Sequence, residues 1–310
     1  MTLVPRPTLF ITSPRLNRHV GLDLTLASET LQHTGSFKFR AAFNNASQRK
    51  AGHLIAVSSG NFGQALAYAC QLHGKRCTVI MPHDASPTKV RAVRAYGAEV
   101  DLVDTRAKAR LERLRELLTA FPDAEAAYPS DGEPTLAGAE ALGDEILAHQ
   151  PAFDTVVAPA GGGGIIVGLV RAKRRLHSHT TILACEPVVA NDLAQSFRAG
   201  ERVTLPAEPT SLADGVRGLG VSPDNWQIIR DGCAGVIEVE EARIAEATRL
   251  LFRLANLLAE PTAALSLAAV LTEPGRCTGR VCCVVTGANV DPATYAQILE
   301  GERDLGAVPR

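Results

Sequence analysis

The segment 155–176 reads TVVAPAGGGGIIVGLVRAKRRL, in which a short apolar run leads through four glycines into a longer amphipathic stretch. This order predicts a buried strand, a loop and a helix. Four consecutive glycines at a helix N-terminus leave backbone N–H groups uncovered, which favours an anion such as phosphate. A tight turn that only lets the helix pack on the sheet needs fewer glycines. We therefore predict an anion-binding loop at Gly161, Gly162, Gly163 and Gly164.

The same strand–loop–helix order is predicted for residues 54–73, and alternating elements follow along most of the chain. Apolar runs predict strands at 54–57, 77–81, 99–103, 155–158, 181–185, 236–239 and 281–286. The stretches between them predict helices at 36–50, 61–73, 87–96, 106–120, 135–149, 164–176, 241–258, 262–271 and 292–299. Strands that alternate with helices form mostly parallel sheets, and ligands bind at the carboxyl ends of such strands. We expect an α/β fold with both glycine-containing loops at a ligand site.

Composition narrows the class of protein. The 310 residues suit two modest domains or one large α/β unit. A net charge of -1 and an aromatic content of 5% do not fit a nucleic-acid-binding surface, and no apolar run is long enough to cross a membrane. Seven cysteines without a CxxC pair, and an N-terminus without the pattern of a signal peptide, predict reduced thiols in the cytoplasm. We expect a cytoplasmic protein that binds neither nucleic acid nor membrane.

Lys38 lies in the heptapeptide TGSFKFR, residues 34–40, at the predicted start of a helix. An amine attacks a carbonyl only when it is partly neutral, and burial or a nearby cation lowers a lysine pKa. Phe37 and Phe39 supply apolar neighbours, and Arg40 supplies a cation. Such a lysine can hold an aldehyde cofactor as a Schiff base. Taken alone, the segment fits an exposed lysine on an amphipathic helix better.

Two further segments are candidates for ligand binding. The loop SSGNFG at 58–63 carries two hydroxyls and an amide, which suit a carboxylate ligand, although an ordinary helix N-cap explains it equally well. Glu186 and Asp192, with a backbone carbonyl between them, can hold a hard divalent cation. Their spacing alone fits an exposed acid and a helix N-cap better.

Together these segments resemble the fold type II pyridoxal phosphate enzymes, specifically the serine/threonine dehydratase and serine racemase group. The resemblance covers nearly the whole chain and rests on six motifs in order: residues 34–40, 58–63, 161–164, 213–216, 260–263 and 286–291. It implies two domains, each an open, mostly parallel sheet flanked by helices. Residues 1–52 and 132–310 would form the large cofactor-binding domain, and residues 53–131 a small mobile domain.

The resemblance also implies a role for each candidate residue. Lys38 becomes the Schiff-base lysine and the general base, and Gly161–Gly164 hold the phosphate of pyridoxal 5'-phosphate. Phe37 and Gly215 pack on the two faces of the ring, Asn61 bonds its phenolic oxygen, and Thr286 faces its nitrogen, where the group usually has serine. The substrate carboxylate is expected to bind at Ser58, Ser59, Gly60, Asn61 and Phe62.

In the racemase branch of this group, the residue that matches Ser59 is a second acid/base, on the opposite face of Cα from the lysine. The same branch binds a cation at residues matching Glu186, the Ala190 carbonyl and Asp192, which favours Mg²⁺ or Ca²⁺ here. Phe62 replaces a common histidine, and the segment 136–141 lacks the usual glutamine and threonine. The lysine of a Lys-x-Glu strand is replaced as well, in the sequence Ala27-Ser28-Glu29. These departures leave the cofactor in place and the substrate open.

The expected activity is an ammonia-lyase that eliminates water from serine, threonine or 3-hydroxyaspartate and yields a 2-oxo acid and ammonia. The alternatives are an amino-acid racemase, a β-replacement enzyme resembling cysteine synthase, and a regulatory protein that only binds the cofactor. The family resemblance implies a homodimer acting on a small amino acid.

Overall fold

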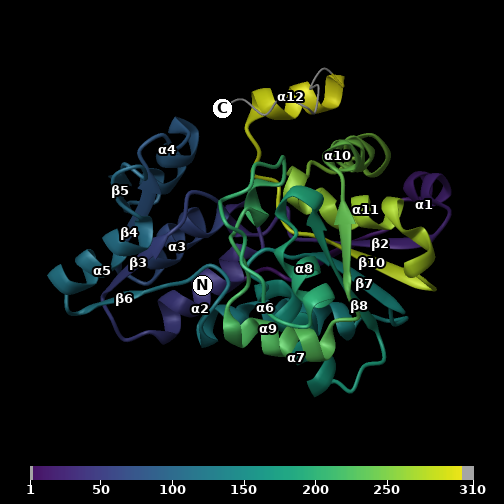
Figure 1. Ribbon diagram of the computed structural model, residues 1–310, viewed down its shortest axis with the longest axis horizontal. Coiled ribbons are helices and arrows are strands. Elements are labelled where there is room, and N and C mark those ends of the chain that lie inside the picture. The colour runs from purple at the N-terminus through teal and green to yellow at the C-terminus, as the bar shows by residue number, and fades with distance from the viewer. Residues whose placement is uncertain (1–2, 302–310) are drawn as a thin grey trace. The chain divides into compact units, whose positions relative to one another are not determined.

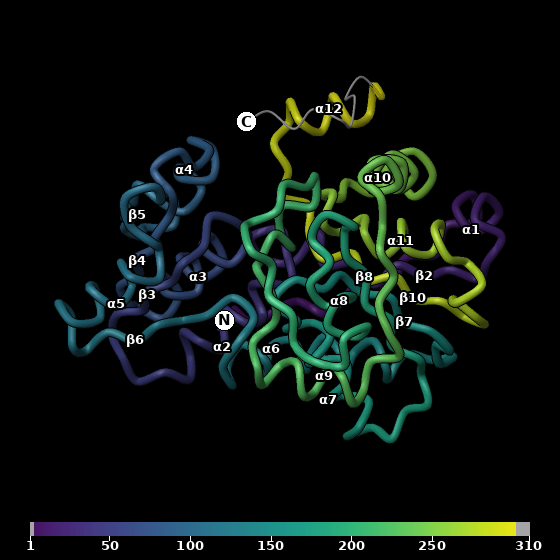
Figure 2. The backbone as a smooth tube through the Cα atoms, viewed as in Figure 1, coloured from purple at the N-terminus to yellow at the C-terminus, as the bar shows by residue number. Residues whose placement is uncertain are grey.

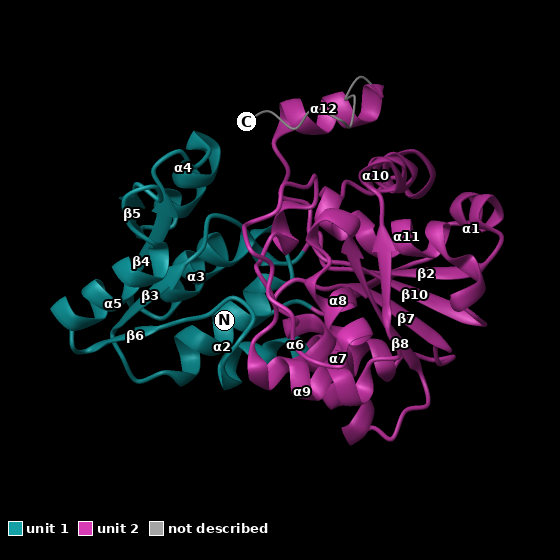
Figure 3. Cartoon of the chain, in the orientation of Figure 1, with its two compact units in different colours: residues 1–6, 32–139 teal, residues 7–31, 140–310 magenta. Residues whose placement is uncertain are grey.

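The structure is a computed structural model that describes residues 3–301. The chain forms two compact units (Figure 3), one of residues 3–6 and 32–139, the other of residues 7–31 and 140–301. Each unit has its own open sheet, which Figures 1 and 2 trace along the chain, and this confirms the expected α/β class. The expected small domain at 53–131 stays a prediction. The compact units group helix α2 (Lys38–Gln48) with the smaller sheet.

The smaller sheet has four parallel strands in the order β5-β4-β3-β6. They are β3 (His53–Val57), β4 (Arg76–Pro82), β5 (Glu99–Val103) and β6 (Ala124–Ala126). The helices of this unit are α2, α3 (Asn61–Leu72), α4 (Pro87–Ala95), α5 (Arg110–Ala120) and the first part of α6 (Glu133–Leu147). Phe39 and Leu66 from α2 and α3 belong to one core cluster, and Leu114 from α5 belongs to another. Central strands of a sheet covered on both faces need apolar side chains throughout, so β3 and β4 contain the apolar runs 54–57 and 79–81, whereas the edge strands β5 and β6 carry charged residues.

The larger sheet has six strands in the order β1-β2-β10-β7-β8-β9. Its strands are β1 (Leu9–Ile11), β2 (Asp23–Ser28), β7 (Thr155–Pro159), β8 (Thr181–Pro187), β9 (Val236–Val239) and β10 (Arg280–Val285). Only β1 pairs antiparallel. The helices are α1 (Pro14–Val20), the rest of α6, α7 (Gly164–Arg175), α8 (Asp192–Ala199), α9 (Pro223–Gly232), α10 (Glu241–Ala255), α11 (Pro261–Thr272) and α12 (Pro292–Glu300). Every residue from Pro261 to Val270 is buried, so α11 is the central helix of this unit's core.

The seven predicted strands and nine predicted helices are all present, and most bounds agree within two residues. The helix predicted from residue 106 begins at Arg110, because Asp104 Oδ1 accepts the backbone N–H of Arg106 at 3.0 Å and closes a turn. The helix predicted to end at 258 ends at Ala255, where Asn256 adopts φ 52° and terminates it. Among the strands and α-helices of residues 3–301, six were not predicted: β1, β2, β6, α1, α8 and α9.

All seven cysteines are free and buried, as predicted. Burial raises the pKa of the Cys185 and Cys283 thiols well above the ordinary value, so these thiols stay protonated and unreactive. Within residues 3–301, no helix is both long and apolar enough to span a bilayer.

Candidate functional site

The glycine loop lies between β7 and α7, as predicted. The first turn of a helix has N–H groups without intrahelical acceptors, so the N-terminus of α7 presents donors at this loop. Gly163 has φ +84°, and a Cβ there would lie 2.7 Å from Ile229 Cδ1. Asn225 Nδ2 donates to the Gly162 carbonyl at 2.7 Å and holds the loop from below. The shape of this loop, residues 161–164, requires glycine at position 163. We call the loop the glycine cradle, and phosphate binding there stays a prediction.

Gly215 lies beside this cradle in a short turn, residues 214–216. Its N–H donates to Thr262 Oγ1 at 2.9 Å. A Cβ on Gly161 would lie 3.4 Å from the Gly215 carbonyl oxygen, so the tertiary structure brings these two predicted site residues together. This hydrogen bond connects the motif at 260–263 to the one at 213–216.

Thr286 follows the last residue of β10 directly and is 2% exposed. Its hydroxyl has no hydrogen-bond partner among the described residues. Cys283 pairs with Val157 in the parallel register, and the same register continued by three residues aligns Thr286 with Ala160, the residue before Gly161. An unpaired buried hydroxyl is costly, and a ligand acceptor or donor relieves that cost. The N–H groups that can bind a phosphate, the adjacent glycine turn and this hydroxyl together fit pyridoxal phosphate.

Lys38 is the first residue of α2 and is half-buried, not the exposed helix lysine that its heptapeptide favours in isolation. Its Nζ lies 4.8 Å from the centre of the Phe37 ring and donates to the Pro129 carbonyl oxygen at 2.6 Å. Phe39 is fully buried behind it. Arg40 is also buried and donates to the Arg6 carbonyl at 3.0 Å. The amine thus lies between an aromatic ring and a carbonyl oxygen.

The loop 58–63 begins α3. The N-cap residue is Gly60, which has no capping side chain, and Ser58 Oγ, two residues earlier, accepts the Gly63 N–H in the first turn at 3.1 Å. A Cβ on Gly63 would lie 2.9 Å from the Ser58 carbonyl oxygen, which requires glycine there. Phe62 is 1% exposed and packs in the core of this unit, so any contact with substrate falls to its backbone N–H. Ser59 and Asn61 lie on the same loop, and their assigned roles stay predictions.

Arg110 is a site candidate that the sequence analysis missed. It begins α5, and its Nη1 lies 3.5 Å from Ser59 Oγ. The two residues are 51 positions apart, and no motif links them. A guanidinium at this place supplies a fixed positive charge beside the predicted carboxylate-binding loop.

Glu186 and Asp192 are both buried, contrary to the exposed acid that their spacing favours. Glu186 Oε2 accepts the Ala194 N–H at 3.1 Å, whereas Glu186 Oε1 and Asp192 Oδ2 have no partner among the described residues. Burial, and next the neighbouring Asp192 carboxylate, raise the pKa of Glu186. Burial also raises the pKa of Asp192 to about 6. No group of three or more His, Cys, Asp and Glu side chains in residues 3–301 forms a metal site, so a cation held by two carboxylates and the Ala190 carbonyl stays a prediction.

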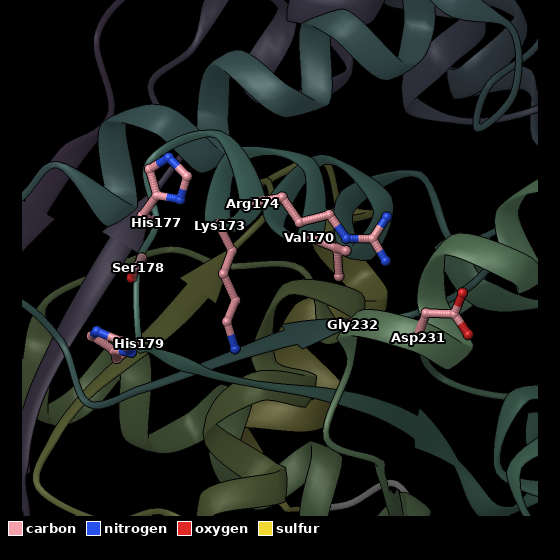
Figure 4. A pocket seen from close by; sticks show the side chains of 8 residues that line it. All are labelled: Val170, Lys173, Arg174, His177, Ser178, His179, Asp231 and Gly232. Carbon is pink, nitrogen blue, oxygen red and sulfur yellow. The ribbon is translucent and has the colours of Figure 1, made fainter.

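An open pocket of about 390 Å³ lies elsewhere in the larger unit (Figure 4). Its lining includes two residues of α7, Lys173 and Arg174, and the last two residues of α9, Asp231 and Gly232. At 1.5 Å per residue, Lys173 is about 14 Å along α7 from Gly164. This pocket is therefore separate from the glycine cradle.

Comparisons with known proteins agree with this geometry. The family model described as pyridoxal-phosphate dependent enzyme matches residues 1–287. The chain is 36% identical to an L-threo-3-hydroxyaspartate ammonia-lyase of Pseudomonas sp. over 95% of this chain and 93% of that protein. It is 33% identical to the serine racemase of Mus musculus over 96% and 90%. The crystal structure of a threonine deaminase from T.th. superposes with a TM-score of 0.86 at 39% identity, covering 92% of each chain. The chain therefore belongs to the pyridoxal phosphate-dependent enzymes, within the fold type II group that contains ammonia-lyases and serine racemases.

Proposed function

We propose that the chain is an ammonia-lyase that eliminates water from a β-hydroxy amino acid and yields a 2-oxo acid and ammonia. The buried Thr286 hydroxyl beside the glycine cradle is the observation that carries this proposal. When bound, pyridoxal phosphate supplies an electron sink for the substrate Cα. A neutral hydroxyl at the ring nitrogen does not enforce a charged ring as a carboxylate does. The weaker sink favours reactions in which a leaving group departs readily.

The protein's own groups divide the work. Lys38 would hold the cofactor through its amine and, when that amine is free, would act as the general base that removes the Cα proton. The N–H groups of the cradle bind the phosphate, and the N–H and O–H groups of the loop 58–62 bind the substrate carboxylate. Phe37 and Gly215 confine the ring, and Asn61 bonds its phenolic oxygen. The half-buried position of Lys38, with its amine beside the Phe37 ring and the Pro129 carbonyl, supports its role as the cofactor lysine.

Among the candidate substrates, we propose 3-hydroxyaspartate over serine and threonine. The support is Arg110, whose guanidinium lies 3.5 Å from the Ser59 hydroxyl. A substrate whose first carboxylate binds the loop 58–62 can direct its second carboxylate to this guanidinium. Pairing of arginine with a carboxylate is strong and geometrically specific, and serine has no group that can make it.

An amino-acid racemase is the second candidate, and one contact favours it. The Arg110 cation next to Ser59 Oγ favours the deprotonated form of that hydroxyl, as any neighbouring positive charge does. Ser59 would then exchange a proton with Cα on the face opposite Lys38. Such exchange inverts the substrate without loss of water.

One experiment separates these activities. The purified enzyme is incubated with L- and D-forms of serine, threonine and threo-3-hydroxyaspartate, and 2-oxo acid, ammonia and enantiomer ratio are measured. Oxo acid from 3-hydroxyaspartate without inversion supports the lyase, whereas inverted substrate with little oxo acid refutes it. Ser59→Ala should abolish inversion and leave elimination. O-acetylserine with sulfide tests β-replacement, and Lys38→Ala should remove the visible absorbance of the bound cofactor.

We also propose that a divalent cation binds Glu186, the Ala190 carbonyl and Asp192. Two buried carboxylates with unpaired oxygens support it, because a cation relieves their desolvation and mutual repulsion.

The family resemblance supports a homodimer, and the seven free thiols support a reducing compartment such as the cytoplasm. Light scattering of the purified protein tests the dimer.

A further inference from the structure

A buried polar chain lies behind Lys38 in the smaller unit. Asn45 is fully buried and donates from Nδ2 to Thr135 Oγ1 at 2.8 Å. Thr135 is 2% exposed and donates in turn to the Tyr128 carbonyl oxygen at 2.8 Å. Asn45 Oδ1 accepts from Arg49 Nε at 2.8 Å, which fixes the orientation of the amide. The side chains of Asn45 and Thr135 thus connect α2 to the backbone just before Pro129.

This chain closes a ring that includes the Lys38 amine. Lys38 and Asn45 both belong to α2 and are seven residues apart, so they lie on the same face of the helix. Tyr128 precedes Pro129, and the Pro129 carbonyl accepts from Lys38 Nζ at 2.6 Å. The position of that carbonyl relative to the amine is therefore set through Asn45 and Thr135.

The contact between α6 and α2 reinforces the same alignment. Gly138 is three residues after Thr135, and the two share a face of α6. A Cβ on Gly138 would lie 2.6 Å from the Ala41 N and 2.7 Å from the Arg40 carbonyl carbon. The helices approach so closely there that only glycine fits. Thr135 consequently contacts α2 at a fixed position along the helix axis, at Asn45, about two turns after Lys38.

Packing alone does not require this arrangement. A pair of apolar side chains of the same volume would join the two helices without the cost of burying an amide and a hydroxyl. The polar pair also fixes the orientation of the peptide between Tyr128 and Pro129, because the Thr135 hydroxyl donates to the Tyr128 carbonyl oxygen. A carbonyl held in this way restricts a long side chain that otherwise samples many rotamers.

We propose that Thr135 and Asn45 are positioning residues for Lys38, which keep the Pro129 carbonyl where it holds the Lys38 amine whenever that amine is not covalently engaged. The proposal rests on Lys38 being the cofactor lysine, as proposed above. A pre-placed amine closes the bond to an aldehyde faster than a mobile one, because orientation is settled before the reaction. The N–H groups proposed to bind the cofactor phosphate belong to the glycine loop, so noncovalent binding of the cofactor should not depend on Thr135.

Stopped-flow mixing of the cofactor-free full-length enzyme with pyridoxal phosphate tests the proposal. Visible absorbance follows covalent capture, and its dependence on cofactor concentration separates a limiting rate from a half-saturating concentration. Thr135→Val, which keeps the shape and removes the hydroxyl, should lower the limiting rate roughly fivefold, the usual effect of one lost hydrogen bond, at an unchanged half-saturating concentration. Thr135→Ser should restore the rate. Thr119→Val is the matched control, because Thr119 is an exposed threonine of the same unit that bonds only within α5.

Asn45→Ala removes the same bond from the α2 side and gives a second, independent reading. The double variant should be no slower than the slower single variant, because both substitutions break one connection. Equal limiting rates in Thr135→Val and the wild type would overturn the inference, as would a loss confined to thermal stability. Borohydride reduction and peptide mapping of the wild type keep the two proposals apart. A label on another lysine refutes the assignment of Lys38, whereas a label on Lys38 with unaltered capture refutes only the positioning role.

Discussion

Replacement of Gly163 by alanine should destabilise the protein through two separable effects. Gly163 has φ +84°, and an L-residue in this left-handed region costs about 1 kcal/mol relative to glycine. The new Cβ would also lie 2.7 Å from Ile229 Cδ1 and 3.1 Å from Val221 Cγ1. Both are ends of side chains that can shift, so the crowding costs about 1–3 kcal/mol more. The expected loss in the free energy of unfolding is about 2–4 kcal/mol.

Gly200 supplies the control. It has φ +74° and nothing within 4 Å of a Cβ, so Gly200→Ala should cost only the backbone term of about 1 kcal/mol. Urea unfolding of the cofactor-free proteins measures both values, and titration with pyridoxal phosphate then measures affinity. Gly163→Ala should also weaken cofactor binding, whereas Gly200→Ala should not, because Gly200 follows α8 and not the cradle. Equal destabilisation by the two substitutions would refute the crowding at Gly163.

Further substitutions test the other parts of the site. Arg110→Ala should lower kcat/KM for 3-hydroxyaspartate about tenfold or more and leave kcat/KM for serine nearly unchanged. Arg115→Ala, at an exposed position of the same helix, is the control. An equal loss for both substrates would contradict the specificity role of Arg110. Thr286→Val removes an unpaired buried hydroxyl, so it should stabilise the cofactor-free protein or leave its stability unchanged. It should also weaken cofactor retention, measured by dialysis. A loss of stability together with a loss of retention would contradict a contact between Thr286 and the cofactor ring. Hydrogen bonding to Arg49 lowers the pKa of Glu125, so its contribution to stability is present above its unfolded pKa and lost as pH falls through the lower folded value. Urea unfolding between pH 6 and 3 should therefore show a steeper decline for the wild type than for Glu125→Gln. A chelator should lower the melting temperature of the wild type near neutral pH but not that of Asp192→Asn; no effect on the wild type counts against the cation.

The regular elements were predictable where burial leaves a strong pattern. Strands such as β7 and β10 are covered on both faces, and their continuous apolar runs identified them. The strands β1 and β6 have three residues each, too few to show a period. Their pairing comes from the neighbouring strand in the sheet, which is a tertiary effect.

The sequence by itself determined where the helix of Lys38 begins and where the glycine loop lies, because both depend on neighbours in the chain. Lys38 begins its helix after a Thr-Gly turn, and Gly163 needs a backbone conformation that only glycine adopts readily. Only the tertiary structure decided what these groups meet. It brought Arg110 to Ser59 over 51 residues and the Pro129 carbonyl to Lys38 over 91. Such pairings follow from which strands share a sheet and which helices cover it, and the physical reason that they escape sequence patterns is that no local periodicity encodes a contact between distant segments.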